Sequence, residues 1–128
     1  MLYKNILLID DDADDAEIFM EAVNAVEKNI VFRSEVNPVK ALEDLEVSET
    51  LPDVIFLDYN MPLLNGKEFL QRIKSRSKLK DIPVILISSP SKEFVTDLLQ
   101  KKEIIHYISK PNSYVELINM LKSVLKLP

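Results

Sequence analysis

The sequence contains no cysteine. This absence excludes disulfide bonds, thiolate zinc sites and cysteine nucleophiles, and it favours a reducing compartment. No apolar run approaches the roughly 18 residues that a membrane-spanning helix needs. Residues 1–12 do not form a signal peptide, because carboxylates rather than a small-residue cleavage site follow their short apolar run. We therefore expect a cytoplasmic protein that does not insert into a membrane.

The sequence is also short of positive charge. Its 16 lysine and arginine residues face 21 acidic residues, which gives a net charge of −5 at pH 7. That balance argues against a nucleic-acid partner, because nucleic-acid-binding domains neutralise phosphates with clustered basic residues. The length of 128 residues, of which 47% are hydrophobic, is typical of one globular domain. We expect a single domain over residues 1–128 with no output domain.

Short apolar segments alternate with segments of helical spacing. Five short segments rich in Ile, Leu and Val predict strands at residues 4–9, 31–36, 54–57, 83–87 and 104–108. The second segment is less apolar than the others, so we predict that it lies at an edge of the sheet. Elsewhere apolar residues recur at intervals of three and four, which predicts five helices, each with one buried face. The residues predicted to be buried on these helices are, in chain order, Ile18, Phe19, Ala22, Val23 and Val26; Val39, Leu42 and Leu45; Phe69, Leu70 and Ile73; Phe94, Val95, Leu98 and Leu99; and Tyr114, Leu117, Ile118, Leu121, Val124 and Leu125.

This alternation indicates the fold class. Continuous apolar strands between amphipathic helices form parallel sheets that helices cover on both faces. The predicted class is therefore α/β, built from five strand–helix units, (βα)5. Ligands bind such open sheets beyond the carboxyl ends of the strands. The residues that follow each strand are therefore the candidates for a functional site.

Polar residues follow four of the five predicted strands. Asp10 and Asp11 follow the first, Asp58 the third, Ser88 the fourth and Lys110 the fifth. Three carboxylates held close together repel each other unless a cation neutralises them, and Mg²⁺ prefers oxygen ligands of this kind. A hydroxyl and an ammonium beside that cation suit a phosphoryl group, which needs positive charge around its oxygens. A carboxylate can itself be the nucleophile and form an aspartyl phosphate.

Each of these residues also has a structural explanation. Six of the eight residues in the range 10–17 are acidic, and acidic residues in a first helical turn cap the helix and favour its dipole. Asp58 fits a turn, Ser88 fits a helix cap, and Lys110 alone fits a solvated surface. Capping is the favoured interpretation for Asp12, Asp14, Asp15 and Glu17. The structural explanations do not account for the convergence of the other five residues on one sheet edge.

Four motifs contain these positions in order: LLIDDD at 7–12, FLDYNMP at 56–62, DIPVILISS at 81–89 and YISKP at 107–111. Over essentially its whole length the sequence resembles the receiver domains of bacterial response regulators, and in particular the stand-alone chemotaxis-type regulators. The resemblance implies a doubly wound, flavodoxin-like fold with a five-stranded parallel sheet in the order 2-1-3-4-5. That order places the first and third strands side by side, and so brings Asp10, Asp11 and Asp58 together.

The resemblance implies a metal site and an acceptor. Asp58 matches the phosphoacceptor of the family. Asp11 matches the direct Mg²⁺ ligand, with Asp58 and the main-chain carbonyl of Asn60 as the other protein ligands. Asp10 matches the residue that binds the metal through water.

The resemblance also implies a set of phosphoryl-binding residues. Ser88 matches the switch hydroxyl that bonds one phosphoryl oxygen, Ser89 offers its backbone N–H to another, and Lys110 pairs with a third. Tyr107 matches the aromatic residue that changes rotamer with the switch hydroxyl. The chain departs from the family pattern at residues 103 and 104, where Glu-Ile replaces a common Gly-Ala.

The implied function is that of a phosphoacceptor in a two-component or phosphorelay pathway, with Mg²⁺ as cofactor. A sensor histidine kinase or phosphotransfer protein would supply the phosphoryl group. A downstream protein would read the face formed by the fourth helix, fifth strand and fifth helix. The chain would catalyse only its own phosphorylation and dephosphorylation at Asp58.

Two alternatives belong to other classes of protein. A receiver-like interaction module would bind its partners without phosphorylation, although such modules usually lose one of the acidic or lysine positions. A phosphatase of the haloacid-dehalogenase type also uses a strand-end aspartate with Mg²⁺. It needs a second acid two residues further on, where this chain has Asn60.

Overall fold

Five strands alternate with five helices in the part of the chain that the computed structural model describes, namely residues 3–59, 66–87, 92–101, 104–108, 111 and 113–125. The elements are β1 (Asn5–Ile9), α1 (Ala13–Val26), β2 (Val31–Glu35), α2 (Pro38–Val47), β3 (Val54–Asp58), α3 (Gly66–Lys74), β4 (Val84–Ile87), α4 (Lys92–Gln100), β5 (His106–Ile108) and α5 (Tyr114–Val124). The strands form one parallel sheet in the order β2-β1-β3-β4-β5. The predicted fold class and strand order are both confirmed.

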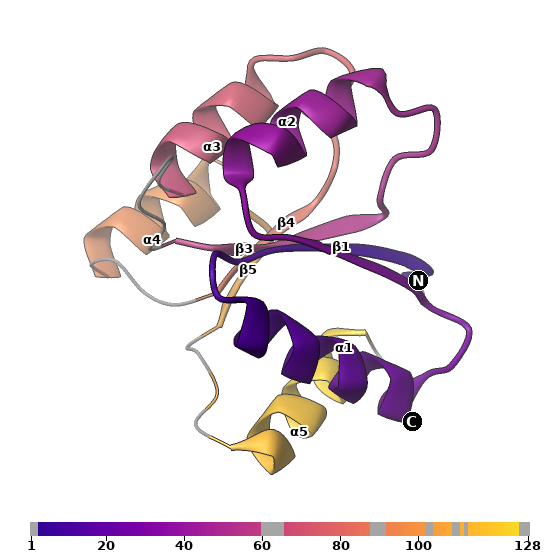
Figure 1. Ribbon diagram of the computed structural model, residues 1–128. Coiled ribbons are helices and arrows are strands. Elements are labelled where there is room, and N and C mark those ends of the chain that lie inside the picture. The colour runs from indigo at the N-terminus through magenta and orange to yellow at the C-terminus, as the bar shows by residue number, and fades with distance from the viewer. Residues whose placement is uncertain are drawn as a thin grey trace.

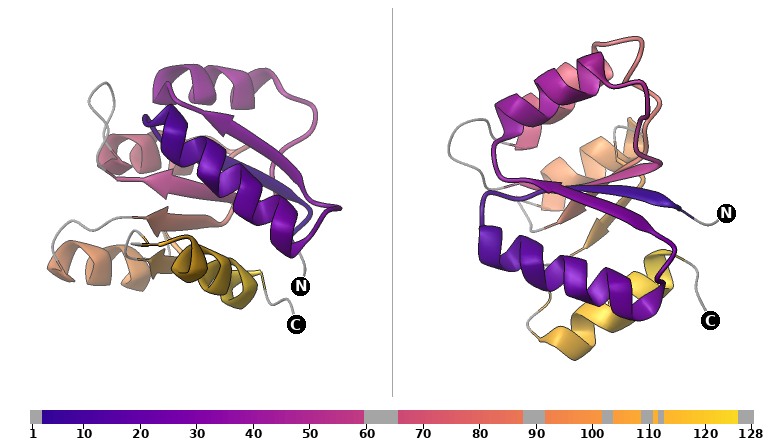
Figure 2. Two further views of the ribbon diagram at one scale, coloured as in Figure 1. Left: turned by 60° about the horizontal axis from the view of Figure 1, so that its bottom comes forward. Right: turned by 45° about the vertical axis from the view of Figure 1, so that its right-hand side comes forward.

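The sheet separates two groups of helices. Figures 1 and 2 show α1 and α5 on one face and α2, α3 and α4 on the other. Because side chains alternate between the faces of a strand, β1 and β3 contribute to a separate core on each side. Leu7, Ile9, Ile55 and Leu57 belong to the core beneath α2, α3 and α4. Ile6, Leu8, Val54 and Phe56 belong to the core beneath α1 and α5.

Polar side chains fix where three helices begin. Asp12 is the N-cap of α1, and its side chain accepts hydrogen bonds from the backbone N–H groups of Asp14 at 2.9 Å and Asp15 at 3.2 Å. Asn37 caps α2 in the same way, and Ser113 caps α5. Each cap satisfies backbone donors that have no partner within the helix. The capping interpretation of Asp12 is therefore confirmed.

Asp53 and Lys78 make hydrogen bonds at the end of the sheet that is opposite the carboxyl ends of its strands. Asp53 Oδ2 accepts hydrogen bonds from the backbone N–H groups of Lys4 at 2.8 Å and Asn5 at 2.9 Å. Lys78 Nζ donates to the carbonyl oxygens of Glu46 and Ser48, both at 2.7 Å, where α2 ends. These contacts tie loops to the start of β1 and the end of α2. The hydrogen bonds of Asp53 and Lys78 thus stabilise the sheet and α2 at the end away from the carboxyl ends of the strands.

Some sequence-based predictions of buried residues were wrong. Four apolar residues assigned to core faces are exposed in the structure: Ile18, Val39, Leu99 and Tyr114. On α1 the buried residues are Ala16, Phe19, Ala22 and Val23, a narrower stripe than the one predicted. The strand predicted at 104–108 begins only at His106, although Ile104 is buried. The side chains of Phe94 and Val95 lie outside the described part of the structure.

Candidate phosphorylation and metal site

The site lies where β1 and β3 end side by side. Ile9, the last residue of β1, pairs with Leu57 of β3, so Asp10 and Asp58 follow at the same level of the sheet. Asp11 comes next in the chain. One carboxylate oxygen from each of Asp10, Asp11 and Asp58 lies within 4.8 Å of the others. The predicted convergence of the three aspartates is therefore a feature of the fold.

Two of the three carboxylates are buried. Asp10 and Asp58 are each 5% exposed, and among the described residues they are the charged side chains that belong to the buried class. Asp11 is exposed. Buried charges of one sign are unfavourable unless a charge of the opposite sign or hydrogen bonds offset them. Among the hydrogen bonds that offset this cost, Asp10 Oδ1 accepts the backbone N–H of Asp12 at 3.0 Å.

The arrangement fits a divalent cation. Carboxylate oxygens are hard ligands, and Mg²⁺ is usually held by one or two carboxylates together with waters and phosphate oxygens. An exposed Asp11 beside two buried carboxylates leaves one side of the cluster open to solvent. A cation there would relieve the repulsion among the three groups. The three aspartates and their spacing are therefore compatible with a divalent cation.

The dense acidic run is divided between two tasks. Asp10 and Asp11 belong to the carboxylate cluster. Asp12 caps α1, and Asp14 and Asp15 lie in its first turn, where they favour the helix dipole. One short run of sequence thus serves both the site and the helix that follows it.

Of the other predicted site residues, the described part of the structure includes Tyr107. Asn60, Ser88, Ser89 and Lys110 lie outside the described residues. Tyr107 is in β5, is partly buried and packs against the core beneath α2, α3 and α4. The roles assigned to Asn60, Ser88, Ser89, Lys110 and Tyr107 therefore remain predictions.

One contact beside Asp58 was missed in the sequence-based analysis. The backbone N–H of Gly66, the first residue of α3, donates to the carbonyl oxygen of Tyr59, the residue after β3, at 3.0 Å. A Cβ atom at Gly66 would lie 2.9 Å from both Cα and Cδ1 of Tyr59. Gly66 is the single glycine of the chain, and that scarcity was the signal available in the sequence.

A Gly66→Ala variant should lose about 1–3 kcal/mol of unfolding free energy, because the new methyl group meets backbone and not only a flexible side chain. Urea denaturation measures this loss. A Gln71→Ala variant, changed at an exposed position of α3, serves as control and should stay within about 0.5 kcal/mol. A Gly to Ala change stabilises a helix where the new methyl group meets no neighbour. If Gly66→Ala likewise raised the unfolding free energy, the close contact with Tyr59 would not determine stability at this position.

Comparisons with known proteins agree with this geometry. The family model described as the response regulator receiver domain matches residues 6–122. The chain is 28% identical over 106 residues to the chemotaxis protein CheY1 of Helicobacter pylori, covering 83% of this chain and 84% of that protein. The crystal structure of the phosphorylated cyanobacterial phytochrome response regulator RcpA superimposes with a TM-score of 0.81 at 27% identity, covering 95% of this chain and 91% of that one.

Other relatives are longer proteins. The chain is 30% identical over 128 residues to the phosphate regulon transcriptional regulatory protein PhoB of Pseudomonas aeruginosa, covering 98% of this chain but 53% of PhoB. It spans 15% of the sensor histidine kinase CheAY of Helicobacter pylori, to which it is 29% identical. No helix in the described ranges is long and apolar enough to cross a membrane. By its sequence and its fold, the chain belongs to the response regulator receiver domains, the phosphoacceptor signalling domains of two-component systems.

Proposed function

We propose that Asp58 accepts a phosphoryl group from a phosphohistidine of a sensor histidine kinase or phosphotransfer protein. A carboxylate oxygen of Asp58 attacks phosphorus, the phosphorus–nitrogen bond breaks, and the imidazole leaves with the electron pair. Water later attacks the phosphorus of the acyl phosphate, the bond from phosphorus to the Asp58 oxygen breaks, and inorganic phosphate and the free carboxylate are released. The observation that carries the proposal is the buried Asp58 carboxylate at the end of β3, within 4.8 Å of Asp10 and Asp11 oxygens.

The residues proposed to hold Mg²⁺ are Asp11, Asp58 and the carbonyl of Asn60, with Asp10 acting through water. Bound Mg²⁺ would neutralise the cluster and the oxygens of the incoming phosphoryl group. Asp10 holds the β1–α1 connection in place through its bond to the Asp12 N–H. Asp58 is held by β3, which is buried along its whole length.

Signalling would follow from new bonds to the phosphoryl oxygens. Ser88, the backbone N–H of Ser89 and Lys110 are proposed to bind one oxygen each, and Tyr107 to change rotamer with Ser88. Such charge-assisted bonds bias an equilibrium between two packings of a domain. The remodelled face would comprise α4, β5 and α5, and a downstream protein would bind it. The chain would catalyse no reaction beyond its own phosphorylation and dephosphorylation.

Incubation with acetyl phosphate tests the proposal. With Mg²⁺ present, the intact mass should rise by one phosphoryl group, and EDTA should abolish that gain. A matched incubation with Ca²⁺, which is larger and less strict in geometry than Mg²⁺, should give less product. If no gain occurs with acetyl phosphate or with phosphorylated donor kinases, the chain is a receiver-like interaction module and the phosphorylation proposal fails.

A further inference from the structure

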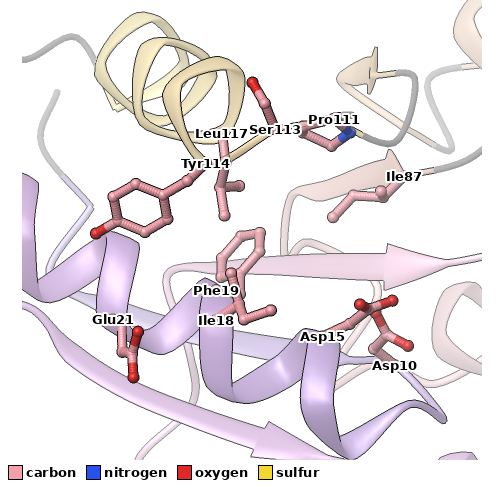
Figure 3. A pocket seen from close by; sticks show the side chains of 10 residues that line it. All are labelled: Asp10, Asp15, Ile18, Phe19, Glu21, Ile87, Pro111, Ser113, Tyr114 and Leu117. Carbon is pink, nitrogen blue, oxygen red and sulfur yellow. The ribbon is translucent and has the colours of Figure 1, made fainter.

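A cleft of about 430 Å³ lies between α1 and α5. Figure 3 shows Phe19 of α1 and Leu117 of α5 in its middle, with Ile18 and Tyr114 at its border. Asp10 lines the cleft and also contributes an oxygen to the carboxylate cluster. The cleft is therefore an extension of the candidate phosphorylation and metal site. The outer edge of the sheet, at β2, is a second uncovered surface.

Strand β2 has a neighbouring strand on one side only. It is the first strand in the sheet order, and among the described residues no strand pairs with its outer side (Figure 2). Val31 is 56% exposed, and Arg33 and Ser34 are exposed as well. Val36, the residue after the strand, is 44% exposed. An open edge of this kind presents unpaired backbone groups to other chains.

The pairing with β1 determines which backbone groups of β2 are available. The N–H of Val31 and the C=O of Glu35 are hydrogen-bonded to the backbone directly before and after β1. Successive residues of a strand direct their backbone groups to opposite sides. The N–H and C=O groups of Phe32 and Ser34 therefore point away from β1, toward the open side.

We propose that β2 pairs with β2 of a second copy of this chain, antiparallel and symmetric about Ser34. In this register Arg33 lies opposite Glu35 of the second copy, and the twofold axis repeats that pair. On the other face of the paired strands, Phe32 lies opposite Val36. Cross-strand pairs of opposite charge, and of an aromatic with a β-branched residue, stabilise antiparallel strands. The pairing closes on itself and gives a dimer.

Charge selects this register over its neighbours. Symmetry about Arg33 would put two guanidinium groups opposite each other, and symmetry about Glu35 would put two carboxylates there, which is destabilising. Arg33 forms no ion pair with the residues that the structure describes. Glu35 accepts the Asn37 N–H at 3.1 Å and pairs with Lys40 at 3.4 Å. The Lys40 side chain is 62% exposed, so that ion pair is weak, and a carboxylate accepts several donors.

Sedimentation equilibrium of the unchanged chain, without Mg²⁺ or a phosphoryl donor, tests the association. The average mass should rise with concentration from the 14.7 kDa of one chain toward twice that value. Because phosphorylation is not involved, failure here would leave the proposed function untouched. A mass that stays at 14.7 kDa up to about 1 mM protein would overturn the dimer.

Two charge-reversed variants locate the interface. Arg33→Glu and Glu35→Arg each place like charges opposite each other, and each alone should associate at least about tenfold more weakly. An equimolar mixture should recover association, because every mixed pair again joins opposite charges. Lys122→Glu, changed at an exposed position of α5, alters the net charge as Arg33→Glu does and should associate normally. Unchanged association of either β2 variant would place the interface elsewhere and reject the proposal.

A Ser34→Cys variant tests the register. The chain has no cysteine, so this variant has a single thiol. Opposite residues of antiparallel strands have Cα atoms about 4.5–5.5 Å apart, a distance that a disulfide spans. With oxidised glutathione, Ser34→Cys should form a disulfide-linked dimer at least about tenfold faster than Ser77→Cys, which is changed at an exposed position outside β2. Equal rates would mean random collision and would overturn the pairing about Ser34.

Discussion

An Asp58→Asn variant incubated with acetyl phosphate and Mg²⁺ should gain no phosphoryl group. The amide keeps the shape of the side chain but has no anionic oxygen to attack phosphorus. Asp58 is buried at the end of a fully buried strand, so an isosteric change should leave the backbone in place. Intact mass and thermal unfolding, measured on the same sample, would show loss of phosphorylation in a folded protein.

The control for this experiment is a second aspartate-to-asparagine change. Asp14 is exposed in the first turn of α1 and lies outside the carboxylate cluster. Asp14→Asn should therefore be phosphorylated as fully as the unchanged protein. Phosphorylation of Asp58→Asn at the normal level would place the acceptor elsewhere, and peptide mapping of the product would identify it.

A Phe56→Ala variant should lose about 3–5 kcal/mol of unfolding free energy. Phe56 is completely buried in β3, and its ring meets that of Phe19 edge to face, with centroids 5.2 Å apart. Removing it leaves a cavity between the sheet and α1, the helix that follows Asp10 and Asp11. Small domains are stable by only about 5–15 kcal/mol, so the loss is a large share of the total. Urea denaturation measures it directly.

The matched control is Phe32→Ala. Phe32 also stacks on Phe19, with centroids 5.7 Å apart, but it lies on the edge strand β2 and is only partly buried. Because solvent already reaches this side chain, we expect less than half the loss seen for Phe56→Ala. Equal losses at the two positions would mean that contact with Phe19, and not burial in the central strand, sets the energy.

Much of the fold could be predicted because its local signals agree with one another. β1, β3 and β4 are continuous apolar runs, and the structure buries every residue of β3 and β4. Pro38 marks the start of α2, as its fixed backbone angle favours. The juxtaposition of Asp10, Asp11 and Asp58 depends on strand order, however. Periodicity alone does not specify that order, and the prediction came from the resemblance to receiver domains.

The remaining errors arose where apolar residues lie next to the buried stripe of a helix. Ile18 adjoins Phe19 in the sequence but points about 100° away from it around α1, so it borders the cleft instead of filling the core. Tyr114 is the first residue of α5 and fits the helical spacing of its buried residues, but its side chain is exposed to solvent. A period identifies a face, but only the packing partner decides how wide the buried part of that face is.

The division of the core by the sheet has a consequence for how such a domain can diversify. Among the described residues, the two buried cores have no member in common, and the strands separate them. Substitutions on opposite faces should therefore change stability additively. Substitutions on the surfaces of α1 and α5 then require no compensating substitutions on the surfaces of α2 and α3. Lineages of this fold can acquire new partners on one side while the strands keep the three aspartates in place.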